Sequence, residues 1–253
     1  MTDVSANLGN VAPDAQPPVD RGAAHESHGP GHGHGDGLVA HHFDDAQQQH
    51  DAIELGMWAF LAQEVLFFGG LFLAYLLYRF QYPEAFAEGS EHLYKSYGAV
   101  NTFVLLTSSL TMALAVHAAK VNDKKALFRY LTATLVLGAM FLGVKAVEWT
   151  IDYREHLIPG RFFGFDYSEY LHGRTPEIGE HVQLFMFVYF CMTGLHALHM
   201  VVGMAILAIV AAQAFRGKTS LRDANFVEMM GLYWHFVDIV WIFLFPFLYL
   251  IKP

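Results

Sequence analysis

Residues 53–78 read IELGMWAFLAQEVLFFGGLFLAYLLY, a mainly apolar run that carries the carboxylic acid Glu64 near its centre. A helix needs about 20 such residues, each adding about 1.5 Å, to cross the hydrocarbon core of a bilayer. Counted from residue 53, Glu64 lies roughly 16 Å along the helix axis, close to the membrane midplane. An ionised acid at that depth costs about 2.5–3.5 kcal/mol. The run therefore predicts a transmembrane helix whose acid is either functional or protonated and hydrogen-bonded inside a helix bundle.

The composition excludes an ordinary soluble domain. Hydrophobic residues make up 54 % and charged residues 15 % of the 253 positions, and the mean hydropathy is +0.31. Apolar runs of this length exceed what one soluble core could bury. The net charge of −9 comes largely from the tail and the loops, and no basic stripe indicates a nucleic-acid partner. The single cysteine, Cys191, can form no disulfide within the chain.

Four more apolar runs are long enough to span a membrane. The sequence thus predicts an all-α, polytopic membrane protein, a five-helix transmembrane bundle over residues 51–253. Its spans are expected at 53–78, 98–119, 127–151, 182–215 and 226–251. Residues 79–96, RFQYPEAFAEGSEHLYKS, contain the helix breakers Pro83 and Gly89 and are predicted to form a polar loop. Residues 152–181 form the longest predicted loop.

Residues 1–50 are rich in Gly, Pro, Asp, Gln and His and contain almost no large apolar residue. Such a segment cannot bury enough surface to offset its chain entropy, so a disordered tail is predicted. It lacks the basic start and the apolar stretch of a signal peptide. Its HESHGPGHGHGDG tract could bind a transition metal loosely, but no rigid spacing defines a site. The favoured interpretation is a soluble, His-rich tail.

The charges of the short loops indicate how the chain is oriented in the membrane. Two loops on the same side of an alternating five-span arrangement are basic, whereas the other two are longer and rich in Asp and Glu. The positive-inside rule therefore predicts a cytoplasmic N-terminus and a C-terminus on the opposite side, which is the periplasm if the membrane is a bacterial inner membrane. The basic side chains are Lys120, Lys124, Lys125 and Arg129 in the first loop and Arg216, Lys218 and Arg222 in the second.

Eight polar or titratable side chains fall inside the predicted spans, and three functions compete to explain them. A haem or metal site is disfavoured because His196 and His199 share one helical face and cannot be opposed axial ligands, and zinc would need a third ligand. A proton-conducting transporter lacks the expected inverted repeat. An accessory subunit of a redox complex remains, and the residues alone leave the choice open. The set is Gln63, Glu64, His117, Glu148, His196, His199, His235 and Asp238.

Lys145 and Glu148 lie three residues apart, so they share a helical face and can neutralise each other. They fall toward the end of the span 127–151, where a lysine can extend its ammonium to the membrane interface. The pattern predicts a structural ion pair at that interface.

Four stretches resemble, in order, signature segments of the third subunit of haem–copper respiratory oxidases: LGMWAFLAQEVLFFGGLF, VNTFVLLTSS, TGLHALHMVVG and YWHFVDIVWIFLF. The resemblance covers residues 53–251 and is similar to the five-helix bacterial form, which lacks the first two of seven helices. It implies an accessory, non-redox subunit of a cytochrome c or quinol oxidase in aerobic respiration. Related proteins accompany nitric oxide reductases, which remain an alternative.

The same resemblance implies partners and site residues. The haem and copper are expected in partner subunits, including the catalytic subunit I, with no cofactor, metal or catalytic residue in this chain. Phospholipid binding and support of proton uptake and turnover are expected. Glu64 falls on the acid of the first shared helix. Glu148 is similar to the acid near the end of the third, although KAVEW departs from the usual glutamine-containing pattern, which leaves Lys145 unexplained.

These considerations predict two sets of site residues. Because the ionised form of Glu64 is costly at its depth, we expect a protonated acid that contacts His196 or His199. Basic side chains at the cytoplasmic interface are expected to hold anionic lipid head groups. The set expected to modulate proton uptake is Glu64, Glu148, His196, His199, His235 and Asp238, and the set expected to bind lipid is Arg216, Lys218 and Arg222.

Overall fold

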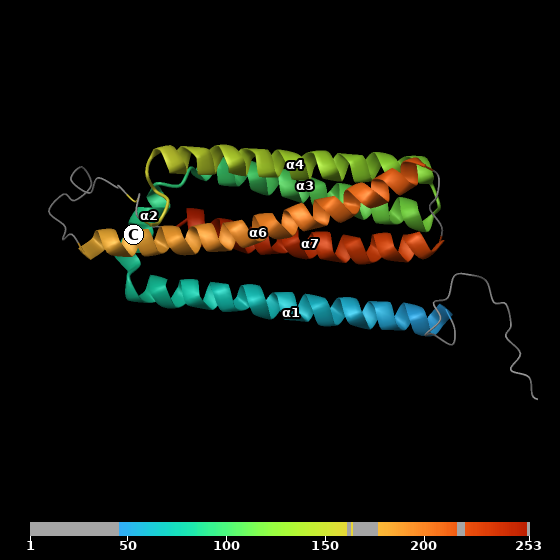
Figure 1. Ribbon diagram of the computed structural model, residues 1–253, viewed down its shortest axis with the longest axis horizontal. Coiled ribbons are helices and arrows are strands. Elements are labelled where there is room, and N and C mark those ends of the chain that lie inside the picture. Colours follow the sequence, from blue (N-terminus) through green and yellow to red (C-terminus); the bar gives the residue numbers. More distant parts are fainter. Residues whose placement is uncertain (1–45, 161–162, 164–176, 217–220, 252–253) are drawn as a thin grey trace, which may run out of the picture. The chain divides into compact units, whose positions relative to one another are not determined.

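The computed structural model describes residues 46–160, 163, 177–216 and 221–251, which all belong to one compact unit, Leu38–Pro253. The described chain contains helices and no strand (Figure 1). Five of the helices are long and apolar enough to cross a membrane, which confirms the predicted all-α, five-span architecture. The helices are α1 (Ala46–Gln81), α2 (Pro83–Glu91), α3 (Lys95–Lys120), α4 (Lys124–Arg154), α6 (Glu177–Phe215) and α7 (Leu221–Tyr249).

Helix α2 lies where the sequence predicted a polar loop, and that prediction was wrong. Pro83 occupies the start of the helix, where its missing N–H would have had no partner within the helix. The helix buries one face that includes Phe86 and Gly89. A Cβ at Gly89 would overlap the ring of Phe185 on α6, so the glycine permits close packing between the two helices. Pro83 therefore begins helix α2, and Gly89 lets it pack closely against α6.

Helices α3, α4, α6 and α7 pack together around tryptophans of α7. The indole Nε1 of Trp234 donates to the Ser108 hydroxyl of α3 at 3.0 Å. The ring of Trp234 also lies against Gly138 of α4 and Gly203 of α6, where an added Cβ would come within about 3.1 to 3.2 Å of it. Small residues thus let the four backbones approach closely, as is typical of helices that associate in a membrane.

The turn between α3 and α4 is short and locally encoded. Asn122 adopts a left-handed φ of 56°, which asparagine tolerates better than most residues. The Asp123 carboxylate then caps α4 by accepting from the backbone N–H groups of Lys125 and Ala126 at 3.1 and 3.0 Å. The two helices therefore return antiparallel, and their contact is the most extensive in the fold.

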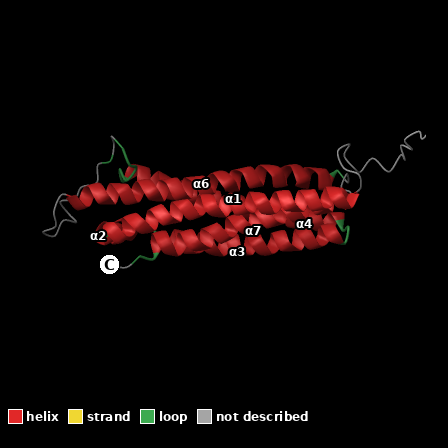
Figure 2. Cartoon of the chain, turned by 90° about the horizontal axis from the view of Figure 1, so that it is seen from below, coloured by secondary structure: helices red, strands yellow, loops and turns green. Residues whose placement is uncertain are grey.

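Helix α1 lies apart from α3 and α4 and in front of the seam between α6 and α7 (Figures 1 and 2). Among its described side chains, only Glu64, Phe68 and Tyr75 are buried, and their spacing places them on one stripe. The Tyr75 hydroxyl donates to the backbone carbonyl of Phe247 on α7. The remaining apolar side chains of α1, such as Leu66, face outward, as expected for a helix in contact with lipid.

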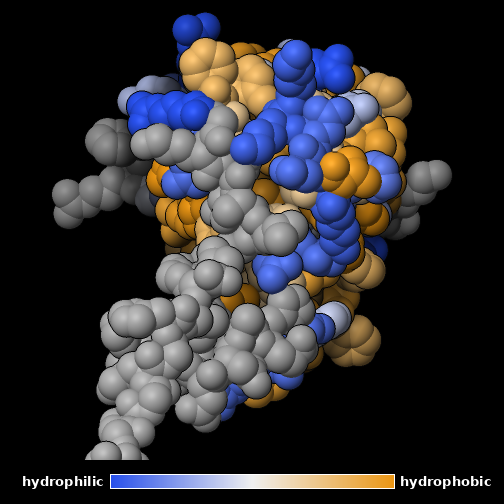
Figure 3. Space-filling view, turned by 90° about the vertical axis from the view of Figure 1, so that its right-hand side faces the viewer, coloured by the Kyte–Doolittle hydropathy of each residue, from blue (hydrophilic) through white to orange (hydrophobic). Residues whose placement is uncertain are grey.

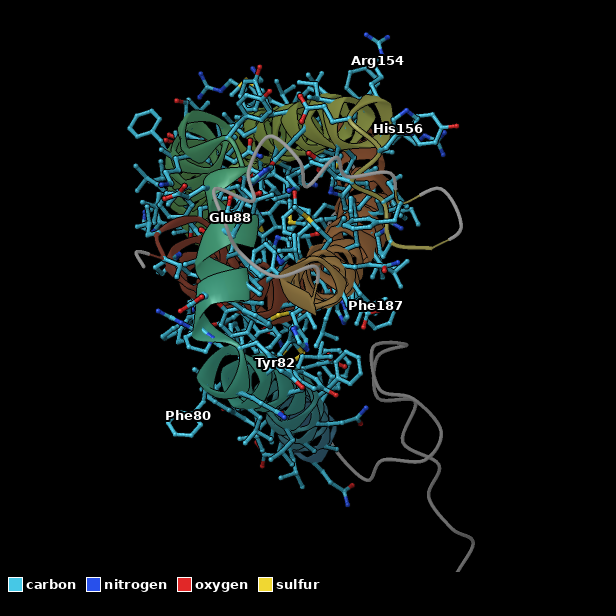
Figure 4. All side chains as sticks on the ribbon, turned by 90° about the vertical axis from the view of Figure 1, so that its left-hand side faces the viewer. Phe80, Tyr82, Glu88, Arg154, His156 and Phe187 are labelled. Carbon is cyan, nitrogen blue, oxygen red and sulfur yellow. The ribbon has the colours of Figure 1, made fainter. Side chains whose placement is uncertain are left out.

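The start of α1, the α3–α4 turn and the facing ends of α6 and α7 lie at one end of the helix bundle (Figure 1). That end presents hydrophilic residues (Figure 3). Lys120 and Glu228 form an ion pair there, with 2.6 Å between nitrogen and oxygen. Helix α2 and the end of α7 lie at the opposite end (Figure 4). The basic segments therefore share one end, and its cytoplasmic location stays a prediction.

Candidate functional site: a buried acid–histidine pair and a buried lysine cluster

Glu64 contacts His199 across the α1–α6 interface. Its Oε2 lies 3.1 Å from His199 Nε2, and Glu64 is 8 % exposed. The other ring nitrogen, Nδ1, lies 2.8 Å from the backbone oxygen of Leu195. A carbonyl oxygen only accepts, so Nδ1 must carry a hydrogen. Glu64 and Nε2 then share one proton in either arrangement: a neutral acid donating to a neutral ring, or a cationic ring donating to a carboxylate.

The sequence offered His196 and His199 as equal candidates for this contact, and only His199 makes it. His196 is 1 % exposed, and its ring lies between Phe141 of α4 and Trp241 of α7, with centroid separations of 5.4 and 5.3 Å. Neither of its ring nitrogens forms a hydrogen bond with the described residues. Three residues correspond to about 300° of helical rotation, so the two rings meet different neighbours despite their proximity in sequence.

Two apolar grooves flank α1 on either side of Glu64 along the helix axis. The first, called the Glu64 groove, has a volume of about 360 Å³, and the Glu64–His199 pair supplies its polar wall. The second has a volume of about 350 Å³ and an almost wholly apolar lining. The Glu64 groove is lined by Met57, Phe60, Glu64, Leu198, His199, Val202, Ile206, Met230 and Tyr233. The second is lined by Val65, Phe68, Gly69, Phe72, Phe236, Ile239, Val240, Phe243 and Phe247.

Lys145 and Glu148 form the predicted ion pair, but the predicted interfacial location is wrong. Lys145 is 2 % and Glu148 0 % exposed, and Nζ lies 3.0 Å from Oε2. The ammonium also donates to the hydroxyls of Tyr189 on α6 and Tyr249 on α7, at 3.0 and 2.9 Å. Side chains of α4, α6 and α7 enclose the lysine instead of letting it extend to the interface, because its helical face points into the bundle.

His235 and Asp238 lie on α7, facing α3. The Nδ1 atom of His235 is 2.7 Å from the Ser109 hydroxyl. Asp238 is 3 % exposed, and its carboxyl oxygens form no hydrogen bond with the described residues. These two residues are therefore separate from the Glu64–His199 pair and belong to the α3–α7 contact.

Sequence reasoning missed three residues that lie at or beside the buried Lys145–Glu148 pair. Tyr189 and Tyr249 lie in apolar runs and are absent from the polar residues singled out above, although a tyrosine buried in a membrane helix needs a partner for its hydroxyl. Asp152 was assigned to a loop, whereas α4 continues through it and buries it completely. A tyrosine hydroxyl within an apolar run is the signal that could have found the first two.

The predicted lipid-binding residues are only partly visible. Arg216 follows the end of α6 and is exposed. Lys218, the side chain of Arg222, the His-rich tract and residues 161–162 and 164–176 of the longest predicted loop lie outside the described residues. Within the described ranges, no three His, Cys, Asp or Glu side chains converge on a possible metal position.

A family model for cytochrome c oxidase subunit III matches residues 156–252, which include His196, His199 and His235. A cytochrome c oxidase subunit 3 from Corynebacterium diphtheriae is 32 % identical over 79 % of this chain and 88 % of its own length. The chain belongs to the cytochrome c oxidase subunit III family. The resemblance predicted from the four motifs is thereby confirmed.

Other members of the subunit III family show its range. A protein named cytochrome bo(3) ubiquinol oxidase subunit 3, from Pseudomonas aeruginosa, is 28 % identical over 84 % of this chain and 91 % of its own length. A protein named heme-copper oxidase subunit I+III, from Aeropyrum pernix, is 31 % identical over 79 % of this chain and 23 % of its own length. Both cytochrome c and quinol oxidases thus contain similar chains.

Proposed function

We propose that this chain is the accessory, non-redox subunit of a haem–copper terminal oxidase and that its Glu64–His199 pair supports proton uptake by the catalytic subunit. Membership of the subunit III family supports the first part. The Aeropyrum pernix relative, whose name joins subunits I and III, supports packing beside subunit I. Haem and copper then belong to the partner subunits, and this chain supplies packing, lipid contact and a proton-holding group.

The observation that carries the proposal is the 3.1 Å contact between Glu64 Oε2 and His199 Nε2, across which the two groups can share one proton. The pair stays neutral overall whichever group holds the proton, so it avoids the cost of an isolated charge in hydrocarbon. It can therefore keep a proton available at the membrane midplane. It lies in the wall of the Glu64 groove instead of deep in the bundle, so its proton faces a lipid or a neighbouring subunit.

The Glu64 groove also supports phospholipid binding. Its wall is apolar apart from the Glu64–His199 pair, and it lies in the half of the bundle that ends at Arg216. An acyl chain in the groove would place a head group toward the end of the bundle that carries Arg216, and Lys218 and Arg222 follow Arg216 in the sequence. Each such residue near an anionic surface contributes about 1 kcal/mol. We further propose that this end is cytoplasmic in a bacterial inner membrane, because its two connecting segments are basic.

The test uses the assembled oxidase with Glu64→Gln, and Glu54→Gln, an exposed acid on the same helix, as the matched control. The amide keeps the shape and a hydrogen bond but cannot hold the shared proton. We expect normal assembly and initial oxygen consumption, together with slower proton uptake or a shorter active lifetime. Complete loss of initial activity in the assembled variant would instead make Glu64 an obligatory proton carrier. The visible spectrum of the co-purified complex would identify its haem type.

A further inference from the structure

Every polar hydrogen of the Lys145 cluster is already directed to an acceptor. The three ammonium hydrogens of Lys145 go to Glu148 and to the hydroxyls of Tyr189 and Tyr249, at 2.9 to 3.0 Å. Each tyrosine hydroxyl in turn donates to Glu148 Oε1, at 3.1 Å from Tyr189 and 2.6 Å from Tyr249. One buried cation and one buried anion therefore satisfy each other, as a buried ion pair must.

Asp152 adjoins this cluster without a donor of its own. It lies one helical turn beyond Glu148 on α4, is 0 % exposed, and forms no hydrogen bond through either carboxyl oxygen with the described residues. An ionised aspartate only accepts hydrogen bonds. Since the five donors of the cluster point elsewhere, an ionised Asp152 would add an unsatisfied second negative charge to a site with one positive charge, which is strongly unfavourable in a buried environment.

We propose that Asp152 is a proton-binding site that holds its carboxyl as the neutral acid. The acid gains one O–H donor, and the Tyr189 hydroxyl is among the groups that act on Asp152. That hydroxyl oxygen accepts one hydrogen from Lys145 and has a second lone pair free for the acid. The ionised Asp152 carboxylate lacks a hydrogen-bond donor, whereas the neutral acid can itself donate to the Tyr189 hydroxyl. Because neutral Asp152 adds no charge to the Lys145–Glu148 pair, the whole cluster stays neutral.

The proton site lies near the end of the bundle that carries α2. The charged groups that act on Asp152 are Lys145 and Glu148 of α4 and Glu155, which directly follows that helix. The titratable groups facing it are Tyr189 of α6, Tyr249 of α7 and Tyr94 before α3. Tyr94 donates to Glu155 at 3.1 Å on the exposed end, and this hydrogen bond raises the pKa of Tyr94. The neighbouring Arg154 and His156 point outward (Figure 4). The geometry points to proton exchange with water at this end, opposite the basic segments.

Infrared spectroscopy of the purified oxidase complex tests the site, because a neutral carboxyl has a C=O band that a carboxylate lacks. We expect a neutral-acid band in the wild type that shifts with ¹³C-carboxyl aspartate and on transfer to D₂O. The Asp152→Asn variant should lose it, whereas the Glu155→Gln and Asp238→Asn variants should retain it. Glu155→Gln controls for the exposed end, and Asp238→Asn controls for the other buried aspartate.

Two results would overturn the proposal. The first is a neutral-aspartate band that persists unchanged in Asp152→Asn. The second result applies even if that variant fails to assemble. It is a labelled complex in which the Asp238→Asn variant shows no neutral-aspartate band. A band that stays unshifted in D₂O would contradict exchange with water at this end.

Discussion

Glu64 on α1 and His199 on α6 are 135 positions apart in sequence, yet their side chains meet at 3.1 Å. The contact ties a helix with mostly exposed side chains to the tightly packed helices beside it. It also fixes the histidine tautomer, because Nδ1 is committed to the Leu195 carbonyl. This hydrogen bond therefore contributes to the attachment of α1, and under the proposed function it also holds one proton.

The Glu64–His199 contact is expected to stabilise the fold measurably. In a double-mutant cycle with Glu64→Leu, His199→Leu and the combined variant, we expect a coupling of about 0.6 kcal/mol and at most about 1.7 kcal/mol. Thermal unfolding of the purified complex in detergent measures it. Strictly additive effects would show that the two groups do not interact energetically.

Breaking the buried lysine pair is expected to be far more damaging than removing both partners. Lys145→Met leaves Glu148 as an unpaired buried charge, which costs about 3–5 kcal/mol. Adding Glu148→Gln should recover most of that loss, because no charge remains. Lys125→Met on the exposed part of α4 is the control and should change stability by no more than about 0.5 kcal/mol. Unfolding midpoints in denaturant give the comparison, and equal effects of Lys145→Met and the control would refute the buried pair.

Gly89→Ala should loosen α2 from α6, because the new methyl group overlaps the Phe185 ring. Overpacking of this kind costs about 1–3 kcal/mol. Gly143→Ala on α4 is the matched control, since an added Cβ there has no neighbour within 4 Å. Its helix propensity should improve by up to about 1 kcal/mol. Limited proteolysis near α2, together with thermal stability, distinguishes the two variants, and identical behaviour would argue against close packing at Gly89.

The proposed orientation predicts opposite accessibility of two exposed positions on α4. In a Cys191→Ser background, Lys125→Cys should react with a membrane-impermeant thiol reagent only from the cytoplasmic side. Arg154→Cys, whose parent side chain points outward at the other end, should react only from the periplasmic side (Figure 4). The reverse pattern would contradict the positive-inside assignment, and labelling of both from one side would contradict a membrane-spanning α4.

The sequence alone determined the five spans, the shared end of the basic segments and the family. Each depends on local properties: the length of an apolar run, the closure of backbone hydrogen bonds within a helix, and short motifs. A contact between Glu64 and the histidines of α6 also followed, because both lie at similar depth. The sequence could not choose between His196 and His199, since that depends on how α6 is rotated against α1.

Tertiary structure decided the rest. Helix α2 forms at a segment with two apparent breakers because Pro83 lies at the start of the helix and Gly89 permits close packing on Phe185. Lys145 is buried because Tyr189 and Tyr249, which are 60 positions apart, bring their hydroxyls to the same ammonium. Asp152 becomes a candidate proton site only because the hydroxyls of Tyr189 and Tyr249 already donate to Glu148. Apolar length is a property of one segment, whereas the partners of a buried polar group come from several helices and depend on how those helices pack.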